Sequence, residues 1–486
     1  MDTAHYMQRA EEFTARLNTE ERLHLSGLKD TFETEAVFDE FQDLFTRDAI
    51  LERLDHRENR IGRYLAEFAV HNYIGQRLSH LTDSVANAQN AAEVRVGEES
   101  LSLCQALGQL HQEPDRSLRR ALEEGVAAAL AQQNAGRSER IAGQREIARE
   151  LGFTHYLALC EDISGLPLRS LGKQMAAFLD ETERTYRSRI QRALQGAGID
   201  PADATDADLR WVLFAPRYTE SFPCERLLPA AKATMTKLGL SLTARNGVHL
   251  DLEQRRGKNP RPFCSPVRVP GEVWVVASPR GGWVDFLSFF HELGHAQHFA
   301  HTYPNLPAPC RLMGDDAVGE AFAFLLQSLV LEREWLRDVM GADTIPSSFL
   351  ELGQLLDFWY VRRYGGKILY ELELHSGDRP VAEMAPRYAR LLGRAMGIRL
   401  APEHYLFDVD DRFYCASYFR GWMFDACLRR YLRERFGRLW FQSAQAGALL
   451  RSLWRRGKQL TAEELADDLG INLCIESLRE RLVTDP

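Results

Sequence analysis

Two histidines one helical turn apart, with a glutamate directly after the first, are the residues whose types and spacing point most directly to chemistry. They belong to the pentapeptide HELGH, in which His291, Glu292 and His295 are the polar members. The segment 284–299 has a helical pattern that Asp285 could N-cap. An i, i+4 spacing puts both imidazoles on one face, where they can share a metal ion. Glu292 lies about 100° round that helix, so it can act as the base toward a water on the metal without being a ligand.

A catalytic zinc ion needs a third protein ligand and one open position. Glu320 is the strongest candidate, near the start of a second predicted helix that Asp315 or Asp316 could cap. The run 321–330 is apolar almost all round, which predicts that this helix is buried. A buried carboxylate needs a charged partner, and zinc would be that partner.

His301 is the alternative third ligand, because it stands where the H-E-x-x-H-x-x-G-x-x-H zinc peptidases place a third histidine. That arrangement needs a glycine at position 298 to turn the chain, and this sequence has His298 there. A surface helix with two histidines would be the simplest alternative to a metal site. It would not account for Gly294, whose use in a helix is to let another backbone or a substrate come close. Nor would it account for the apolar neighbours Phe286, Leu287, Phe289, Phe290 and Leu293.

The elements that must position these residues are mostly helical. Long segments rich in Ala, Leu, Glu, Arg and Gln, such as Ser117 to Gln133 and Leu171 to Leu194, predict helix after helix in the first part of the chain. A loop-like segment, 196–208, is the best internal boundary. A β-hairpin is predicted for 240–252, with strands 240–244 and 248–252 around an Asn-Gly turn, and a further strand is predicted at 272–277. Helical patterning returns from 285 to the end, so we expect a mainly α fold with one small sheet.

Composition narrows the functional classes. The chain has 60 basic and 69 acidic residues, a net charge of −9 and a pI near 5.9, which argues against a nucleic-acid partner. No apolar run is long enough to span a membrane, and no secretory signal is visible. The eight cysteines contain no C-x-x-C pair. We therefore expect a cytoplasmic protein with no membrane partner.

At this point the sequence resembles the thimet oligopeptidase and oligoendopeptidase F family of zinc peptidases. The resemblance rests on HELGHAQH at 291–298, on the spacing of Glu320, and on RRGKNPRPFC at 255–264. It implies a large helical peptidase fold with two halves around a deep channel, Zn²⁺ held by His291, His295 and Glu320, and short peptides as substrates. It also implies an N-terminal helical region, 1–195, and a catalytic region, 209–486, in one intertwined unit. The strand at 272–277 resembles the one along which the family lays its substrate, although a plain core strand would have the same sequence pattern.

The same resemblance implies a hydroxyl donor to the tetrahedral intermediate in the region from His404 to Trp422. Tyr418 and Tyr414 are the best candidates, while another register places Gly421 where relatives have the key tyrosine. Arg420 could pair with a substrate carboxylate or be structural.

Three functions remain open from the sequence. The first is a zinc-dependent peptidase, the second a catalytically inactive zinc-containing helical scaffold or peptide-binding protein, and the third an aminopeptidase of the related glutamate-ligand class. Asp316 could orient a ligand histidine, although capping is the simpler role. The sequence indicates neither endo- versus carboxypeptidase action nor the oligomeric state.

Overall fold

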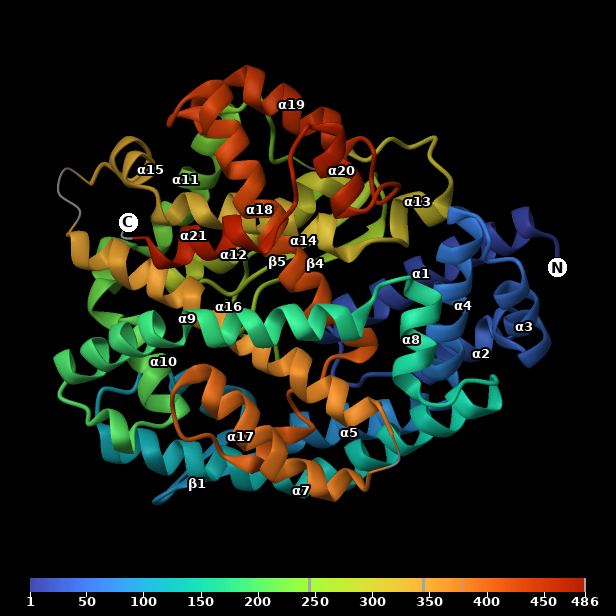
Figure 1. Cartoon of the computed structure of the whole chain (residues 1–486), viewed down its shortest axis with the longest axis horizontal. Helices are drawn as coiled ribbons and strands as arrows, with labels where there is room; N and C mark the ends of the chain where they lie inside the picture. Colours follow the sequence, from blue (N-terminus) through green and yellow to red (C-terminus); the bar gives the residue numbers. More distant parts are fainter. Residues whose placement is uncertain (244–245, 343–345, 378, 485–486) are drawn as a thin grey trace. The chain divides into compact units, whose positions relative to one another are not determined.

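A computed structural model describes residues 1–243, 246–342, 346–377 and 379–484 of the chain (Figure 1). The chain is 71% helical with a small sheet, which confirms the mainly α prediction. It divides into two compact units, each built from three segments. Unit 1 comprises 1–13, 29–214 and 359–416, and unit 2 comprises 14–28, 215–358 and 417–486.

Both units take residues from each of the predicted regions 1–195 and 209–486. This mixing agrees with the expectation that the two regions form one intertwined unit. The division into regions 1–195 and 209–486 stays a prediction. The deep channel between two halves also stays a prediction. None of the helices in the described part of the chain combines the length and the hydropathy that a membrane crossing requires.

The helices of unit 1 are α2 (Thr34–Glu40), α3 (Arg47–Asp55), α4 (Arg60–Arg77), α5 (Ser79–Ala91), α6 (Leu103–Gln109), α7 (Arg116–Glu150), α8 (Tyr156–Ser164), α9 (Leu168–Gly196), α10 (Asp206–Phe214) and α17 (Met384–Met396). Those of unit 2 are α11 (Cys224–Lys237), α12 (Trp283–His301), α13 (Ala308–Leu312), α14 (Asp316–Gln327), α15 (Arg333–Asp338), α19 (Ala444–Trp454), α20 (Ala462–Asp468) and α21 (Ile475–Val483). Three helices contribute to both units: α1 (Thr3–Leu25), α16 (Ser347–His375) and α18 (Tyr414–Phe436).

Unit 1 confirms the long helices predicted near its centre, since 117–133 lies inside α7 and 171–194 inside α9. It also contains a hairpin that the sequence analysis missed, β1 (Glu93–Val96) paired antiparallel with β2 (Glu99–Ser102). Val94 of this hairpin is buried in a core with residues of α6 and α7. The alternation of apolar and polar residues around Gly97 was the available signal.

Unit 2 contains a three-stranded sheet whose order is β3-β5-β4, with β3 at Val248–Asp251, β4 at Phe263–Arg268 and β5 at Glu272–Val276. β3 pairs with β5 in parallel, and β4 pairs with β5 antiparallel. The predicted hairpin at 240–252 is therefore wrong: 240–243 form no strand, and 244–245 lie outside the described residues. β3 instead finds its partner some twenty-five residues later, with Val248 opposite Val273.

β5 is the central strand, flanked on both sides, so it has no free edge for a substrate, and of the two interpretations of 272–277 the structure supports the plain core strand. Val273 and Val275 are fully buried. Lys258, from the RRGKNPRPFC segment, joins the ends of the two parallel strands: its ammonium donates to the backbone oxygens of Asp251 at 3.0 Å and Ala277 at 2.8 Å. This lysine therefore has a structural use.

Helix α12 lies beside α14 and also packs next to β4 and β5 (Figure 1). Gly294 of α12 makes this approach possible, because a Cβ at that position would stand 2.5 Å from the Cα of Ala323. On α18, Gly421 has the same role: a Cβ there would stand 2.7 Å from the Cβ of Glu320. Helix α14 is thus in close contact with the two helices through two glycines, which confirms the interpretation of Gly294.

Candidate active site

Three potential ligand atoms converge where α12 meets α14. The Nε2 atoms of His291 and His295 are 3.2 Å apart. Glu320 places its Oε2 3.4 Å from Nε2 of His291 and its Oε1 3.6 Å from Nε2 of His295. Bonds of about 2.0–2.1 Å from a tetrahedral zinc ion to nitrogen and oxygen separate neighbouring ligands by about 3.3 Å. The two imidazole nitrogens and the carboxylate therefore fit a zinc ion in both type and spacing.

Local capping explains how Glu320 is presented. Asp315 is the N-cap of α14, and its side chain accepts a hydrogen bond from the backbone of Ala317 at 3.1 Å. Asp316 instead forms an ion pair with Lys458. The prediction of Asp285 as the N-cap of α12 is wrong, because Gly282 holds that position. Asp285 lies in the first turn and accepts from the backbone N–H groups of the loop before it.

The two imidazoles differ in electrostatics. Burial lowers the pKa of His291, but the hydrogen bond and the charge of Glu320 outweigh burial and raise it overall. For His295, burial dominates and lowers the pKa to about 4, although Glu320 opposes it. His295 is thus held neutral at physiological pH, the form in which imidazole binds a metal.

Glu292 follows His291 on α12 and is itself partly buried. Burial raises the pKa of its carboxyl to about 7, opposed by His291 and by a hydrogen bond from the backbone of Cys264 in β4. The contact with Cys264 places the Glu292 carboxylate against the sheet.

His301, the alternative third ligand, does not join these atoms. Its Nδ1 lies 2.9 Å from the backbone oxygen of Gln297, and its ring is 5.4 Å from that of Trp454. The structure therefore brings Glu320, and not His301, to the histidine pair.

One residue beside the pair was not predicted. The side-chain oxygen of Gln327 is 2.9 Å from Nδ1 of His291. In the sequence, the only signal was a polar residue interrupting an apolar run.

Of the two candidate tyrosines, only Tyr418 belongs to unit 2. Its ring lies 5.9 Å from that of Phe324, which in turn lies 5.1 Å from the ring of His291. Tyr414 belongs to unit 1, at the first position of α18. The ring of Phe324 therefore lies between Tyr418 and His291.

Two other residues of α18 have structural roles. Arg420 binds both carboxylate oxygens of Asp315 at 2.7 Å and donates to Glu463 at 2.9 Å, so its guanidinium is committed to the protein. Gly421 has no room for a side chain against Glu320. A tyrosine at that position, as one register suggested, would not fit this packing.

A second cluster of potential ligands lies in unit 1. Glu371, Asp410 and Cys415 offer atoms within 4.8 Å of one another. The thiol of Cys415 donates to Glu371 at 3.1 Å, and the ammonium of Lys367 lies 2.7 Å from Asp410. This cluster therefore contains a cation of its own.

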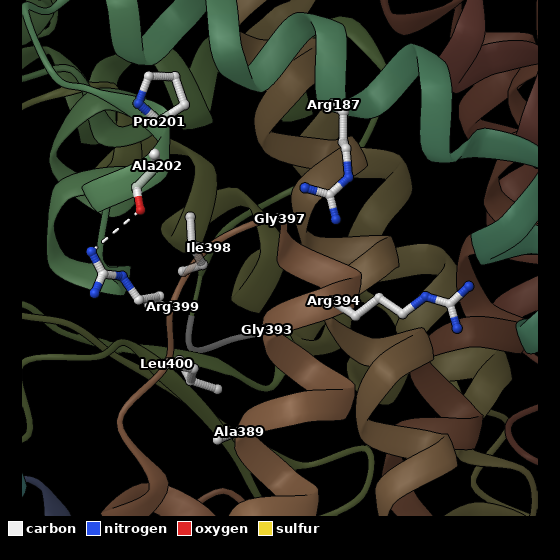
Figure 2. A pocket seen from close by; sticks show the side chains of 10 residues that line it. All are labelled: Arg187, Pro201, Ala202, Ala389, Gly393, Arg394, Gly397, Ile398, Arg399 and Leu400. Carbon is white, nitrogen blue, oxygen red and sulfur yellow. Dashed lines mark hydrogen bonds between the residues drawn. The ribbon is translucent and has the colours of Figure 1, made fainter.

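Unit 1 also has a hollow of about 540 Å³ (Figure 2). Arg187, Arg394 and Arg399 are among its lining residues, and Arg399 donates to the backbone oxygen of Ala202. Each arginine also pairs with a carboxylate, from Glu183, Asp180 and Asp203 respectively. The positive charge of the hollow is thus compensated.

Comparison with known proteins identifies solved structures of similar fold. No protein-family model and no curated protein sequence matches the chain. Among solved structures, a protein of Bacillus anthracis strain Ames assigned as an oligoendopeptidase F is similar at 13% identity and a TM-score of 0.63. A PZ peptidase A solved with an inhibitor is similar at 14% identity and a TM-score of 0.66. Each alignment covers 99% of this chain and 85% of the other. The chain therefore has the large helical fold of these peptidases.

Proposed function

We propose that this chain is a zinc-dependent metallopeptidase that hydrolyses peptide bonds in short peptides. The observation that carries the proposal is the convergence of two imidazoles and one carboxylate: Nε2 of His291 and Nε2 of His295 are 3.2 Å apart, and the two oxygens of Glu320 lie 3.4 Å from the first and 3.6 Å from the second. The fold shared with an oligoendopeptidase F and a PZ peptidase supports it. We further propose membership in the family that the sequence resembles.

Two imidazoles and one carboxylate form a ligand set typical of catalytic zinc, which leaves the fourth position to water or substrate. When bound, zinc lowers the pKa of water toward about 7 and polarises the scissile carbonyl. The close approach of α12 and α14, through Gly294, holds the three ligand atoms at this spacing.

Glu292 is the proposed general base. It follows a ligand on the same helix, and the backbone N–H of Cys264 holds its carboxylate. It accepts a proton from the attacking water and returns that proton to the nitrogen of the leaving amine. A site with a purely structural metal has no use for a carboxylate in this position.

Tyr418 is the proposed hydroxyl donor to the oxyanion, and Tyr414 is the second candidate. The packing of Tyr418 on Phe324, next to His291, supports this order. The proposed setting is the cytoplasm, and all eight cysteines are thiols in the structure, in keeping with a reducing compartment.

The test compares wild type with Glu292→Gln for bound zinc and for cleavage of a pool of short peptides. We expect both proteins to bind zinc equally and cleavage to fall at least about 10³-fold in the variant, the scale of losing a general base. Glu225→Gln, at an exposed position of α11, is the matched control and should cleave as wild type does. Bound zinc with no cleavage by wild type would favour the inactive scaffold, and absence of bound zinc would exclude both functions.

A further inference from the structure

Gln327 lies beside the proposed zinc ligand His291, and the proposed mechanism gives it no role. Its side-chain oxygen lies 2.9 Å from Nδ1 of His291. A carboxamide oxygen can only accept a hydrogen bond, so this contact requires the proton of a neutral His291 to be on Nδ1. The lone pair is then on Nε2, the atom that faces His295 and Glu320.

We propose, resting on the function above, that Gln327 is a positioning residue for the metal: it fixes His291 in the tautomer and ring orientation that present Nε2 to the ion. Ligand histidines generally need such a partner for the nitrogen that does not bind the metal.

The position of Gln327 on α14 supports this role. It follows Glu320 by seven residues, which is about 20° short of two full turns, so both side chains project from the same face. One face of α14 thus supplies a ligand at its start and the partner of another ligand at its end.

Phe324, on the same helix, adds a second restraint. Its ring lies 5.1 Å from that of His291, tilted by 59°. The imidazole is therefore in contact with an aromatic ring and hydrogen-bonded at Nδ1, which leaves its ring plane little freedom. Gln327 achieves this as a neutral group and adds no negative charge beside Glu320.

The variants that test the proposal are Gln327→Leu, which removes the acceptor and leaves a side chain of similar volume, and Gln327→Glu, which keeps an acceptor. Ser328→Ala is the matched control. It removes the neighbouring buried polar group, whose hydroxyl donates locally to the backbone of Leu325 at 2.8 Å.

The readout is the zinc dissociation constant, measured by competition with a chromogenic chelator, so that activity plays no part. We expect Gln327→Leu to weaken zinc binding by about 10- to 100-fold, and Gln327→Glu and Ser328→Ala to stay within a few-fold of wild type. The metal-free melting temperatures of Gln327→Leu and Ser328→Ala should be alike.

Equal zinc affinity of Gln327→Leu and wild type would overturn the proposal, and so would an equal loss in Ser328→Ala, which would indicate a purely structural effect. Either result leaves the proposed function standing, because wild type still binds zinc. A wild-type protein that binds no zinc would instead remove the proposed function, and with it this role.

Discussion

Unit 1 and unit 2 each bring three potential metal ligands within 4.8 Å of one another, and the two clusters differ in what balances their charge. In unit 2, Glu320 faces two imidazoles, and burial keeps one of them neutral. In unit 1, Lys367 lies 2.7 Å from Asp410, so a metal ion would have to displace an ammonium group. Three convergent donor groups are therefore not sufficient for a metal site. A metal ion is needed to balance the carboxylate charge only where no protein cation, such as Lys367, already does so.

The largest expected effect concerns zinc stoichiometry. We expect wild type to bind one zinc ion per chain, His295→Ala to bind none at stoichiometric zinc, and Cys415→Ser to bind one, since only the unit 2 cluster fits the ion. Elemental analysis of dialysed protein measures this. If wild type bound two zinc ions per chain and Cys415→Ser lost one of them, the unit 1 cluster would also be a zinc site and the proposed difference between the units would be wrong.

The next effect concerns Lys367. Its side chain is 4% exposed, so Lys367→Met would leave the partly buried carboxylate of Asp410 without its cation. The free energy of unfolding should fall by about 3–5 kcal/mol, as for other broken buried ion pairs. Denaturant titration gives the value. Lys173→Met, at an exposed position, is the control and should change the free energy of unfolding by less than about 0.5 kcal/mol. If the two variants lost the same free energy, Lys367 would not be balancing the charge of Asp410.

A smaller effect is expected from Gly421→Ala. The added methyl group would stand 2.7 Å from the Cβ of Glu320, so α18 and α14 must separate. We expect a loss of about 1–3 kcal/mol in the free energy of unfolding, together with weaker zinc binding. Gly196→Ala, where a Cβ meets nothing within 4 Å, is the control. Unchanged zinc affinity in Gly421→Ala would show that the arrangement of the ligands does not depend on this contact.

The last expected effect is a pH dependence in the unit 1 cluster. Burial raises the pKa of Glu371 to about 8, and the charge of Asp410 adds to this while Lys367 opposes it. Between about pH 4.5 and 8 the folded protein retains a proton that the unfolded chain has lost, so this contribution to stability is full below pH 4.5 and is lost as pH rises through 8. Unfolding midpoints from pH 5 to 9 should decline less in Glu371→Gln than in wild type. A parallel decline would mean that Glu371 does not hold this proton.

The comparison also shows which features a sequence can predict. The pair His291 and His295 is local, because an i, i+4 spacing fixes its geometry once the helix is known. Glu320 could be added because a carboxylate in an apolar helix needs a partner. The unit 1 cluster draws on residues 371, 410 and 415, whose meeting depends on tertiary packing that no local pattern encodes.

The errors have the same origin. The sequence predicts a strand at 248–252 paired with the nearest segment, 240–244, whereas β3 pairs in parallel with β5. The central place of β5 and the contact of Gln327 with His291 are likewise relations between distant segments. Local patterns predict the long helices at 117–133 and 171–194 and the two helices that hold His291, His295 and Glu320, whereas the pairing of the strands depends on contacts between segments far apart in the sequence.

The two glycines against α14 have a consequence for ion choice. Where main chains touch, helices cannot slide together or apart by adjusting side-chain rotamers, so the opening between the ligands has a nearly fixed size. An ion that forms longer bonds than zinc would have to push three helices apart. Discrimination by ionic radius would then be a property of Gly294 and Gly421, residues that touch no ion themselves.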